Sequence, residues 1–299
     1  NGPCASRTNR DGAMELLSYG RIVSAGVDPI EKKPLYHFHP GRPILSVAAP
    51  GCNLHCMFCQ NWTISQDGAA RTMKTSPADL VAMAQAEESV GIAFTYSEPL
   101  VWFEFVRDTA GIVREKGLKN VLVTNGFLNR EPLAELLPLI DAANIDLKSM
   151  DDRFYRKVCK ARLQPVLAAI RQFADAGVHV ELTNLLIPGH NDSDAQISRL
   201  VDFVVELGSD TPLHFSAYHP AWKFDAPPTP LETLLRARDL AAAKLDYVYL
   251  GNARTAAGRD TSCPGCGRVV IERSGYGGRV KLAEGARCPD CGTALPIVV

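Results

Sequence analysis

Short apolar runs alternate with longer helical patterns along most of this chain, and that alternation limits the fold more than any other feature. The candidate strands occupy residues 44–48, 91–95, 120–124, 143–147, 178–186, 213–217 and 247–250. Helical patterns lie between them at residues 77–89, 101–116, 131–137, 163–176, 194–207 and 230–244. Parallel neighbours in a sheet need helical crossovers. This order therefore predicts an α/β fold with a parallel sheet, either doubly wound or closed into a full or partial β/α barrel.

Two of the predicted helices have clear start signals. Ser76 precedes Pro77 and lies three residues before Asp79, which is the pattern of an N-cap followed by proline in the first turn. Thr229 and Glu232 have the same spacing, again with proline directly after the first residue, and they predict a capping box. Both signals support helices at the places where the apolar periodicity puts them.

Polar side chains follow the ends of most predicted strands. In parallel α/β folds the chemistry gathers at the carboxyl ends of the strands, so these side chains are predicted to line one rim of the sheet. The rim candidates are Ser97, Glu98, Asn125, Asp146, Lys148, His190, Asn191, Tyr218, His219 and Asn252.

The composition excludes several classes of protein. The chain has 299 residues, of which 46% are hydrophobic and 22% charged, as in a folded globular protein. Its formal net charge is −1, which does not favour binding to nucleic acid or to an anionic membrane. No apolar stretch approaches the roughly 18 residues that a membrane-spanning helix needs. The polar first ten residues do not have the pattern of a signal peptide.

The chain has nine cysteines, an odd number, and seven of them are clustered. A disulfide framework does not suit a chain with this much apolar core, whereas such clusters are typical of metal ligands in a reducing cytosol. We therefore expect a cytoplasmic protein. The cysteines fall into the group Cys52, Cys56 and Cys59, the pairs Cys263/Cys266 and Cys288/Cys291, and the isolated Cys4 and Cys159.

The first cysteine group forms a CxxxCxxC loop directly after the first predicted strand. Three thiolates at this spacing can bind three irons of a cubane 4Fe-4S cluster and leave the fourth iron open to another ligand. Phe58, next to the last cysteine, would shield such a cluster from water. A zinc site of the Cys₃His type that includes His55 is the alternative that the spacing leaves open.

Two CPxCG turns near the end of the chain predict a second metal site. Each turn directs two thiolates toward one ion, so Cys263, Cys266, Cys288 and Cys291 together make a closed tetrahedral set. We expect a structural zinc ribbon at residues 260–299, because this module has too little apolar core to fold without a metal. A rubredoxin-like iron site and an auxiliary iron–sulfur cluster are the alternatives.

The three-cysteine loop, with an aromatic residue before its last cysteine, resembles the radical S-adenosylmethionine (radical SAM) superfamily. Further stretches are similar to the AmmeMemoRadiSam-system radical enzymes, a branch that resembles pyruvate formate-lyase activating enzymes. They read PLYHF at 34–38, CQNW at 59–62, TYSEP at 95–99, TNGF at 124–127, IDLK at 145–148 and YLGN at 249–252. The resemblance implies a partial (β/α)6 TIM-like barrel at residues 43–259, after an N-terminal extension at 1–42.

The resemblance also implies a mechanism and its cofactors. The methionyl amine and carboxylate of S-adenosylmethionine would chelate the open iron of a 4Fe-4S cluster. An electron from a flavodoxin- or ferredoxin-like donor would then cleave the cosubstrate to a 5′-deoxyadenosyl radical, which abstracts hydrogen from an unknown small molecule or protein. Activation of a glycyl-radical enzyme is one version of this function. A catalytically idle electron-transfer or scaffold protein is the alternative from another class.

The superfamily usually has a Gly-Gly-Glu motif after the second strand, where it receives the methionyl ammonium group. This chain has Tyr96, Ser97 and Glu98 there, so it keeps the acid and lacks both glycines. The alternative role for Glu98 is that of an acid at the start of the next helix. Asp146 and Lys148, two residues apart on one face of a strand end, resemble an Asp-x-Lys pair near the methionyl group and ribose, or else form a mutual salt bridge.

Four more residues complete the predicted cosubstrate contacts, on the third, fifth and sixth strands or directly after them. Ordinary turn chemistry at the third strand and a structural role for the histidine are the alternatives. The four residues are Thr124, Asn125, Asn184 and His219. On the fifth strand both Thr183 and Asn184 interrupt the apolar run, and one of them is expected to point inward.

The two isolated cysteines have simpler interpretations. Cys4 lies in a segment similar to one that follows further cysteines in the resembled family, so we expect either the remnant of a clipped metal-binding segment or a free thiol. The first residue is Asn1 rather than methionine, which also suggests a processed, tagged or clipped chain. Cys159 is expected to be a plain or partly buried thiol.

Overall fold

The computed structural model describes residues 4, 6–66 and 70–299, and its centre is a mainly parallel sheet. The strand order in this eight-stranded sheet is β12-β11-β10-β9-β8-β7-β5-β4. β4 (Ser24–Pro29) pairs antiparallel with β5 (Pro43–Ala48), and the other strands run parallel to β5. Those parallel strands are β7 (Gly91–Phe94), β8 (Lys119–Thr124), β9 (Ala142–Asp146), β10 (His179–Leu186), β11 (Leu213–Ala217) and β12 (Val248–Gly251).

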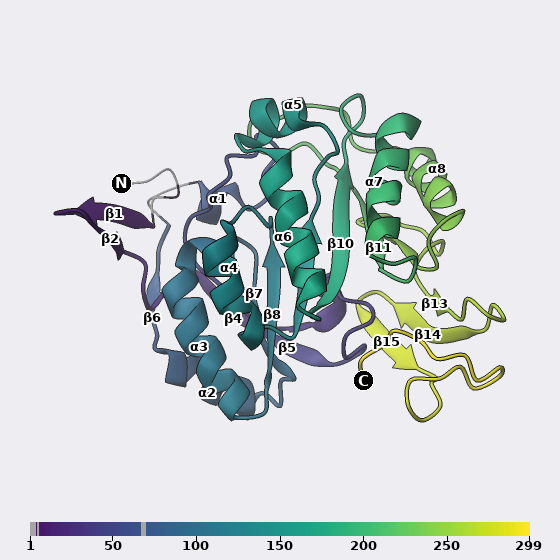
Figure 1. Ribbon diagram of the computed structural model, residues 1–299, viewed down its shortest axis with the longest axis horizontal. Helices are drawn as coiled ribbons and strands as arrows, with labels where there is room; N and C mark the ends of the chain where they lie inside the picture. Colours follow the sequence, from purple (N-terminus) through teal and green to yellow (C-terminus); the bar gives the residue numbers. More distant parts are fainter. Residues whose placement is uncertain (1–3, 5, 67–69) are drawn as a thin grey trace.

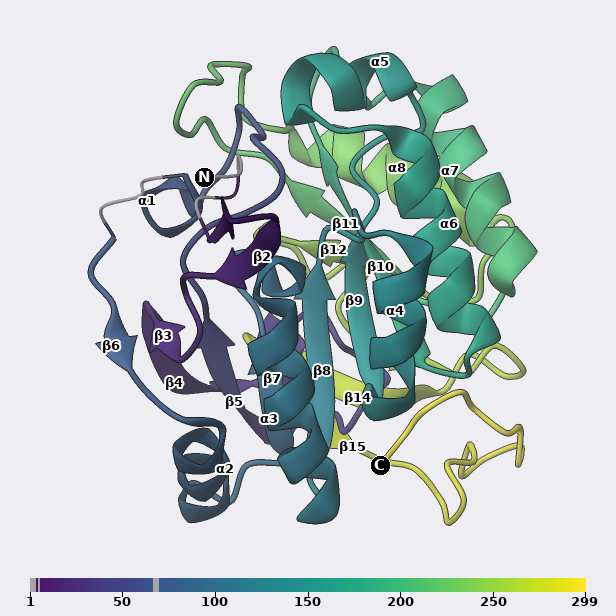
Figure 2. The ribbon, with the colours of Figure 1, turned by 60° about the vertical axis from the view of Figure 1, so that its left-hand side comes forward.

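A helix follows each parallel strand from β5 to β11, as the alternation predicts. The helices are α2 (Pro77–Ala86), α3 (Phe103–Glu115), α4 (Arg130–Leu136), α6 (Leu163–Asp175), α7 (Asp194–Leu207) and α8 (Leu231–Ala242). In Figure 2, α3, α4 and α6 lie side by side over β7, β8 and β9. The parallel α/β arrangement is therefore confirmed, while closure toward a barrel stays a prediction. None of the described helices is both long and apolar enough to cross a membrane.

The segment before the first predicted strand is more ordered than its loop-rich sequence indicates. β1 (Arg7–Arg10) and β2 (Ala13–Leu16) form a hairpin that projects from the body of the molecule in Figure 1. β3 (Arg21–Ile22) pairs with β6 (Met73–Lys74), and β4 adds an edge strand to the main sheet. β4 is mostly exposed and has no regular apolar alternation, so pairing with β5 rather than local pattern makes it a strand.

The two predicted helix starts have different outcomes. The capping box at Ser76 is confirmed: its hydroxyl accepts a hydrogen bond from the Asp79 amide at 3.1 Å, and the Asp79 carboxylate accepts one from the Ser76 amide at 3.0 Å. The capping box at Thr229 is wrong, because α8 begins at Leu231 with Pro230 in the cap position. The Thr229 hydroxyl instead accepts from the Tyr218 amide at 2.8 Å and donates to the Leu186 carbonyl at 2.6 Å. Partners on β10 and directly after β11 compete successfully with the local cap.

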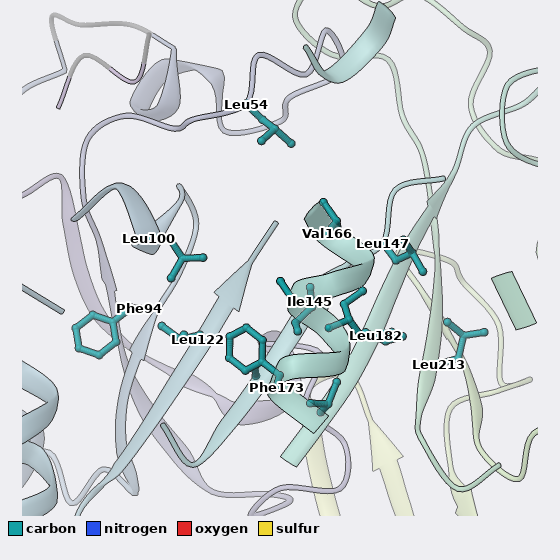
Figure 3. Close-up of a cluster of buried hydrophobic side chains, with 14 of the residues drawn as sticks. Leu54, Phe94, Leu100, Leu122, Ile145, Leu147, Val166, Phe173, Leu182 and Leu213 are labelled. Atoms are coloured by element: carbon teal, nitrogen blue, oxygen red, sulfur yellow. The ribbon is translucent and has the colours of Figure 1, made fainter. Parts of the chain in front are cut away.

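The main hydrophobic core lies between the sheet and the covering helices (Figure 3). Leu122, Ile145 and Leu182 come from three neighbouring strands and are fully buried. They lie against α6, which contributes Val166 and Phe173. Because successive strand residues point to opposite faces, this packing commits the alternate residues to the other face of the sheet.

The face of the sheet opposite the helices, the inner face, is covered at one end of the strands and open at the other. Toward the amino ends, Leu35 and Phe38 of the N-terminal segment pack on Ala93 and Val121 of the sheet. Beside them, the buried Glu181 accepts hydrogen bonds from the His37 amide at 2.7 Å and from His214 Nε2 at 2.6 Å. This packing closes the amino end, which leaves the carboxyl ends of the strands as the place where the inner face is open.

The C-terminal module is a separate three-stranded antiparallel sheet. Its strands are β13 (Thr261–Ser262), β14 (Val269–Ser274) and β15 (Gly277–Val280), and it has a small hydrophobic cluster of its own. In Figure 1 it lies beside the amino ends of the main strands. Arg273, which is 2% exposed, joins the two parts by donating to the Tyr36 carbonyl at 2.7 Å and to the Arg259 carbonyl at 3.1 Å.

Candidate active site

A pocket of about 340 Å³ opens at the carboxyl ends of the parallel strands. Its walls come from the loops after β5, β7, β8 and β9 and from the inner faces of β10 and β11. Most of the residues predicted from the sequence meet there. They are Cys52, Cys56, Cys59, Tyr96, Ser97, Glu98, Thr124, Asn125, Asp146 and Lys148.

Two predicted cosubstrate residues do not line this pocket. On β10 the lining side chains are Thr183 and Leu185, and Asn184 between them faces the other way, with its amide donating to the Leu147 carbonyl at 2.6 Å. The two-residue period of a strand decides this placement. His219 lies exposed after β11, and Ser216 is the residue of that strand that lines the pocket. These two placements correct the expectation from sequence.

The three-cysteine loop is held by backbone hydrogen bonds on both sides. The amides of His55 and Met57 donate to the carbonyls of Cys159 and Val158, both at 3.0 Å. Those acceptors belong to a π-helical turn, Tyr155–Cys159, of a kind often found at functional sites. Before the first cysteine, Gly51 has φ +94°, and a Cβ there would lie 2.3 Å from the Cys4 carbonyl oxygen. The tight entry to the loop therefore requires glycine.

The environment of the three loop sulfurs disfavours free thiolates. Burial raises the pKa of the Cys52 thiol well above its usual value, and burial also raises the pKa of Cys59. For Cys56, contact with the Cys159 thiol and burial raise the pKa well above the usual value. Thiols in such a place keep their protons until a bound metal displaces them, so metal binding here would release protons.

The spacing of the loop cysteines does not suit a single zinc ion. With Zn–S bonds of about 2.3 Å, a tetrahedral site needs sulfurs roughly 3.8 Å apart. In the described part of the chain, Cys52, Cys56 and Cys59 do not belong to any ligand set with all atoms within 4.8 Å of one another. A larger metal group fits this arrangement better than the Cys₃His alternative does.

The C-terminal cysteines have the opposite geometry. Cys263, Cys266, Cys288 and Cys291 form a set with all sulfurs within 4.8 Å of one another. The Sγ atoms of Cys263 and Cys291 are 3.6 Å apart, as are those of Cys266 and Cys288. This is close to the sulfur spacing of a single tetrahedral ion, so the predicted four-cysteine set is confirmed, and the identity of its metal stays a prediction.

Glu98 is buried at the pocket floor and holds two strand ends together. It is 1% exposed, and its carboxylate accepts from the Leu100 amide at 2.9 Å, the Thr124 hydroxyl at 2.7 Å and the Asn125 amide at 2.8 Å. The bond to Leu100 caps a 3₁₀ turn, Pro99–Trp102, as the helix-start interpretation predicts. Burial raises the pKa of Glu98 to about 7 despite these bonds.

This raised pKa predicts a pH dependence of stability in the cluster-free protein. Glu98 ionises near pH 4.5 when unfolded and near pH 7 when folded, so the stability it contributes is full below pH 4.5 and is lost as the pH rises through 7. The resulting decrease in the free energy of unfolding is at most about 3 kcal/mol. We expect urea unfolding of wild type and Glu98→Gln at pH 5 and pH 8 to show a smaller pH effect in the variant. Equal pH effects in both proteins would contradict this.

Asp146 and Lys148 form an ion pair at the end of β9, with Lys148 Nζ 2.8 Å from Asp146 Oδ2. Burial opposes the charge on Lys148, but the Asp146 carboxylate and the nearby thiols hold its pKa well above the usual range. The same ammonium lies 6.0 Å from the centre of the Phe58 ring. The pair is thus a salt bridge and also part of the pocket wall beside the cysteine loop.

Tyr96 lies where the resembled superfamily usually has glycine, and its backbone adopts a conformation that glycine favours. Its φ is +67°, a left-handed conformation that is costly for a bulky residue and is often found at functional sites. The side-chain amide of Asn61 donates to the Tyr96 carbonyl at 2.8 Å, and the Tyr96 phenol donates to the Asp28 carboxylate. Lys33 also approaches, with Nζ 3.1 Å from the phenol oxygen. These bonds hold the strained turn.

Several pocket residues were not predicted from the sequence. Lys32 comes from the N-terminal segment, whose course the apolar pattern does not reveal. Others adjoin the cysteine loop, and the CQNW motif already pointed to two of them. The further polar lining residues are Gln60, Asn61, Ser65, Gln66 and Ser216.

The two isolated cysteines are both buried. Cys159 is fully buried, more than the partial burial expected, and its thiol contacts that of Cys56. Cys4 lies beside Gly51, and its carbonyl accepts from the Ser6 hydroxyl at 3.2 Å.

We compared the chain with protein families and with individual proteins. A family model described as the Radical SAM superfamily matches residues 46–203. The chain is 45% identical over 305 residues to the uncharacterized protein MJ0808 of Methanocaldococcus jannaschii, covering 100% of this chain and 91% of that one. It is 28% identical over 176 residues to the pyruvate formate-lyase 1-activating enzyme of Escherichia coli, covering 56% of this chain and 71% of the enzyme.

A solved structure shares the fold. A radical SAM methyltransferase from Sphaerobacter thermophilus superposes with a TM-score of 0.55 at 20% identity, covering 72% of this chain and 68% of that one. At this identity the likeness concerns the fold alone.

Proposed function

Because this chain belongs to the radical SAM superfamily, we propose that it is an enzyme that reductively cleaves S-adenosylmethionine in the pocket at the strand ends. The observation that carries the proposal is the shared pocket. The three loop cysteines and the acidic and basic residues after β7 and β9 line the same 340 Å³ space. A bound 4Fe-4S cluster would supply the electron for cleavage, and the product after hydrogen abstraction from substrate is 5′-deoxyadenosine.

The three loop cysteines would hold the cluster. Their sulfurs are fixed from two sides, since the loop backbone is bonded to the π-helical turn and Gly51 sets its entry. Cys56 and Phe58 are nearly buried at 7% and 5% exposure, so these residues would help to exclude water from a bound cluster. All three cysteines also line the pocket, which would leave room there for a further ligand.

The pocket charges would orient the cosubstrate. The Lys148 ammonium can pair with the methionyl carboxylate, and Asp146 keeps that ammonium in place. Glu98 would receive the methionyl ammonium through its remaining acceptor capacity, with Thr124 and Asn125 holding its carboxylate. Tyr96 and Ser97 would contribute at the same turn. Asn184 and His219 take no part in this proposal because they do not line the pocket.

The remaining parts of the chain have proposed roles as well. We assign residues 43–259 to the catalytic module, a partial barrel, and residues 260–299 to a structural zinc ribbon. The ribbon assignment rests on the compact four-cysteine set and its closed geometry. Residues 1–42 form an extension that supplies Lys32 to the pocket. A flavodoxin- or ferredoxin-like protein is the proposed electron donor.

Activation of a glycyl-radical enzyme is the second candidate function. It is supported by the similarity to pyruvate formate-lyase activating enzyme, which spans 56% of this chain. The substrate would then be a protein rather than a small molecule.

The proposal is tested by anaerobic reconstitution. With dithionite and S-adenosylmethionine, the reconstituted protein is expected to form 5′-deoxyadenosine, measured by liquid chromatography and mass spectrometry. Protein without reconstituted iron is the control and should form none. Absence of product from protein whose 4Fe-4S cluster is verified by electron paramagnetic resonance would exclude the enzyme and favour the scaffold alternative.

A further inference from the structure

A serine hydroxyl contacts one of the three loop sulfurs. Ser65 Oγ lies 3.2 Å from Cys59 Sγ, and Ser65 is 6% exposed. Ser65 is the last residue of the short helix α1 (Trp62–Ser65), and the Ser65 amide donates to the Asn61 carbonyl at 3.0 Å. Next to it, the Gly51 amide donates to the Ile64 carbonyl at 2.9 Å. The hydroxyl is therefore held beside the sulfur by the same backbone that forms the cysteine loop.

The side chain of Gln66 contacts the Ser65 hydroxyl. Its side-chain amide donates to Ser65 Oγ at 3.3 Å and to the Leu54 carbonyl at 3.0 Å. The bond to the Leu54 carbonyl fixes the nitrogen on this side of the amide. Because the serine oxygen accepts from Gln66, its own proton is free to point at Cys59. A thiolate has no proton to give, so Ser65 is the donor once Cys59 is ionised.

The other two sulfurs have different surroundings. Cys52 Sγ accepts hydrogen bonds from the Leu54 backbone amide at 3.4 Å and from the Asn125 side-chain amide at 3.6 Å. Cys56 faces the Cys159 thiol instead. The Ser65 hydroxyl is thus the side-chain donor that serves Cys59 among the described contacts.

We propose that Ser65, oriented by Gln66, is a positioning residue that donates a hydrogen bond to the Cys59 thiolate and raises the reduction potential of the cluster. This inference rests on the proposed function, because it needs the cluster at Cys52, Cys56 and Cys59. Reduction adds negative charge to the cluster and its sulfurs. A donor aimed at a ligand sulfur stabilises that charge more in the reduced state than in the oxidised state.

The consequence concerns electron entry. A higher potential makes the cluster easier for a protein donor to reduce, and a lower one makes it a stronger reductant once charged. Ser65 sets this balance through its contact with Cys59. Its removal should therefore change the potential measured in the absence of S-adenosylmethionine.

The test is a redox titration of the reconstituted protein without S-adenosylmethionine, followed by electron paramagnetic resonance. We expect Ser65→Ala to shift the midpoint potential to a more negative value than in wild type. Ser65→Thr keeps the hydroxyl and should stay near wild type. Gln66→Leu keeps the serine but releases its orientation, so a smaller shift in the same direction is expected. Ser46→Ala removes a buried hydroxyl from β5 and should leave the potential unchanged.

The outcomes separate this inference from the proposed function. A wild-type protein that assembles no cluster overturns the proposed function. A wild-type protein with a cluster and a Ser65→Ala variant of unchanged potential overturns only the role of Ser65, as does a Ser65→Thr shift as large as that of Ser65→Ala. If Ser65→Ala fails to assemble a cluster, Gln66→Leu becomes the deciding variant. An unchanged potential in Gln66→Leu would contradict the proposed hydrogen bond from Ser65, oriented by Gln66, to Cys59.

Discussion

Replacement of Cys56 by alanine is expected to abolish formation of 5′-deoxyadenosine while leaving the metal of the C-terminal ribbon bound. Cys56 is one of three proposed ligands, and loss of one thiolate leaves an iron of the cluster without its protein ligand. The other four cysteines belong to the C-terminal module, which lies beside the opposite ends of the strands, so they should be unaffected (Figure 1). Elemental analysis for iron and zinc, together with the product assay, measures both effects in one sample.

Cys159→Ala is the matched control for this prediction. Cys159 is as buried as Cys56 and contacts it, but it lies outside the proposed ligand set. We expect this variant to keep its iron and its activity, apart from a loss of stability from the small cavity. Cluster loss in Cys159→Ala together with cluster retention in Cys56→Ala would reverse the assignment of ligands.

Replacement of Cys288 by alanine is expected to release the ribbon metal and unfold the ribbon. Cys288 is 1% exposed and lies within the small cluster formed with Val270, Ile271, Leu295 and Ile297. Binding of a structural zinc ion contributes about 10–16 kcal/mol in small zinc modules, far more than this core can replace. Hydrogen exchange followed by mass spectrometry should show protection lost across β13–β15, and elemental analysis should show zinc lost with iron retained.

The same variant tests how the ribbon supports the rest of the chain. Arg273 holds the Tyr36 carbonyl from the ribbon side, so ribbon unfolding should also raise exchange around Tyr36. Cys4→Ala, which removes a cysteine from neither metal set, is the control and should keep the ribbon metal. Full retention of a tightly bound ion in Cys288→Ala would contradict a four-cysteine site.

Much of the fold was predictable because parallel strands are buried on both faces. Short apolar runs such as the one in β7 stand out from their polar surroundings, and the helices between them have regular apolar spacing. β4 lacked such a pattern, since it is an exposed edge strand whose partner is β5. The cap at Thr229 failed for a related reason, because its hydroxyl bonds to Leu186 and Tyr218, which are distant in sequence.

The candidate site divides in the same way. The cysteine sets were predictable because the ligands of each lie in one or two tight turns, where spacing alone brings sulfurs together. The choice between Thr183 and Asn184 was not, because both are polar and the sequence pattern left open which of the two faced inward. Only the pairing of β10 with its neighbouring strands decides which alternate residues face inward.

By itself, the sequence determined that this chain forms a parallel α/β sheet, has two groups of cysteines spaced like metal ligands and belongs among the radical SAM proteins. The tertiary structure alone decided what surrounds those cysteines. Glu98 meets Thr124 and Asn125 across two strand ends, and Ser65 reaches Cys59 with its proton directed by Gln66. The physical reason is that ligand spacing is a local property of the chain. Burial, hydrogen-bond partners and pKa depend on segments that only folding brings together.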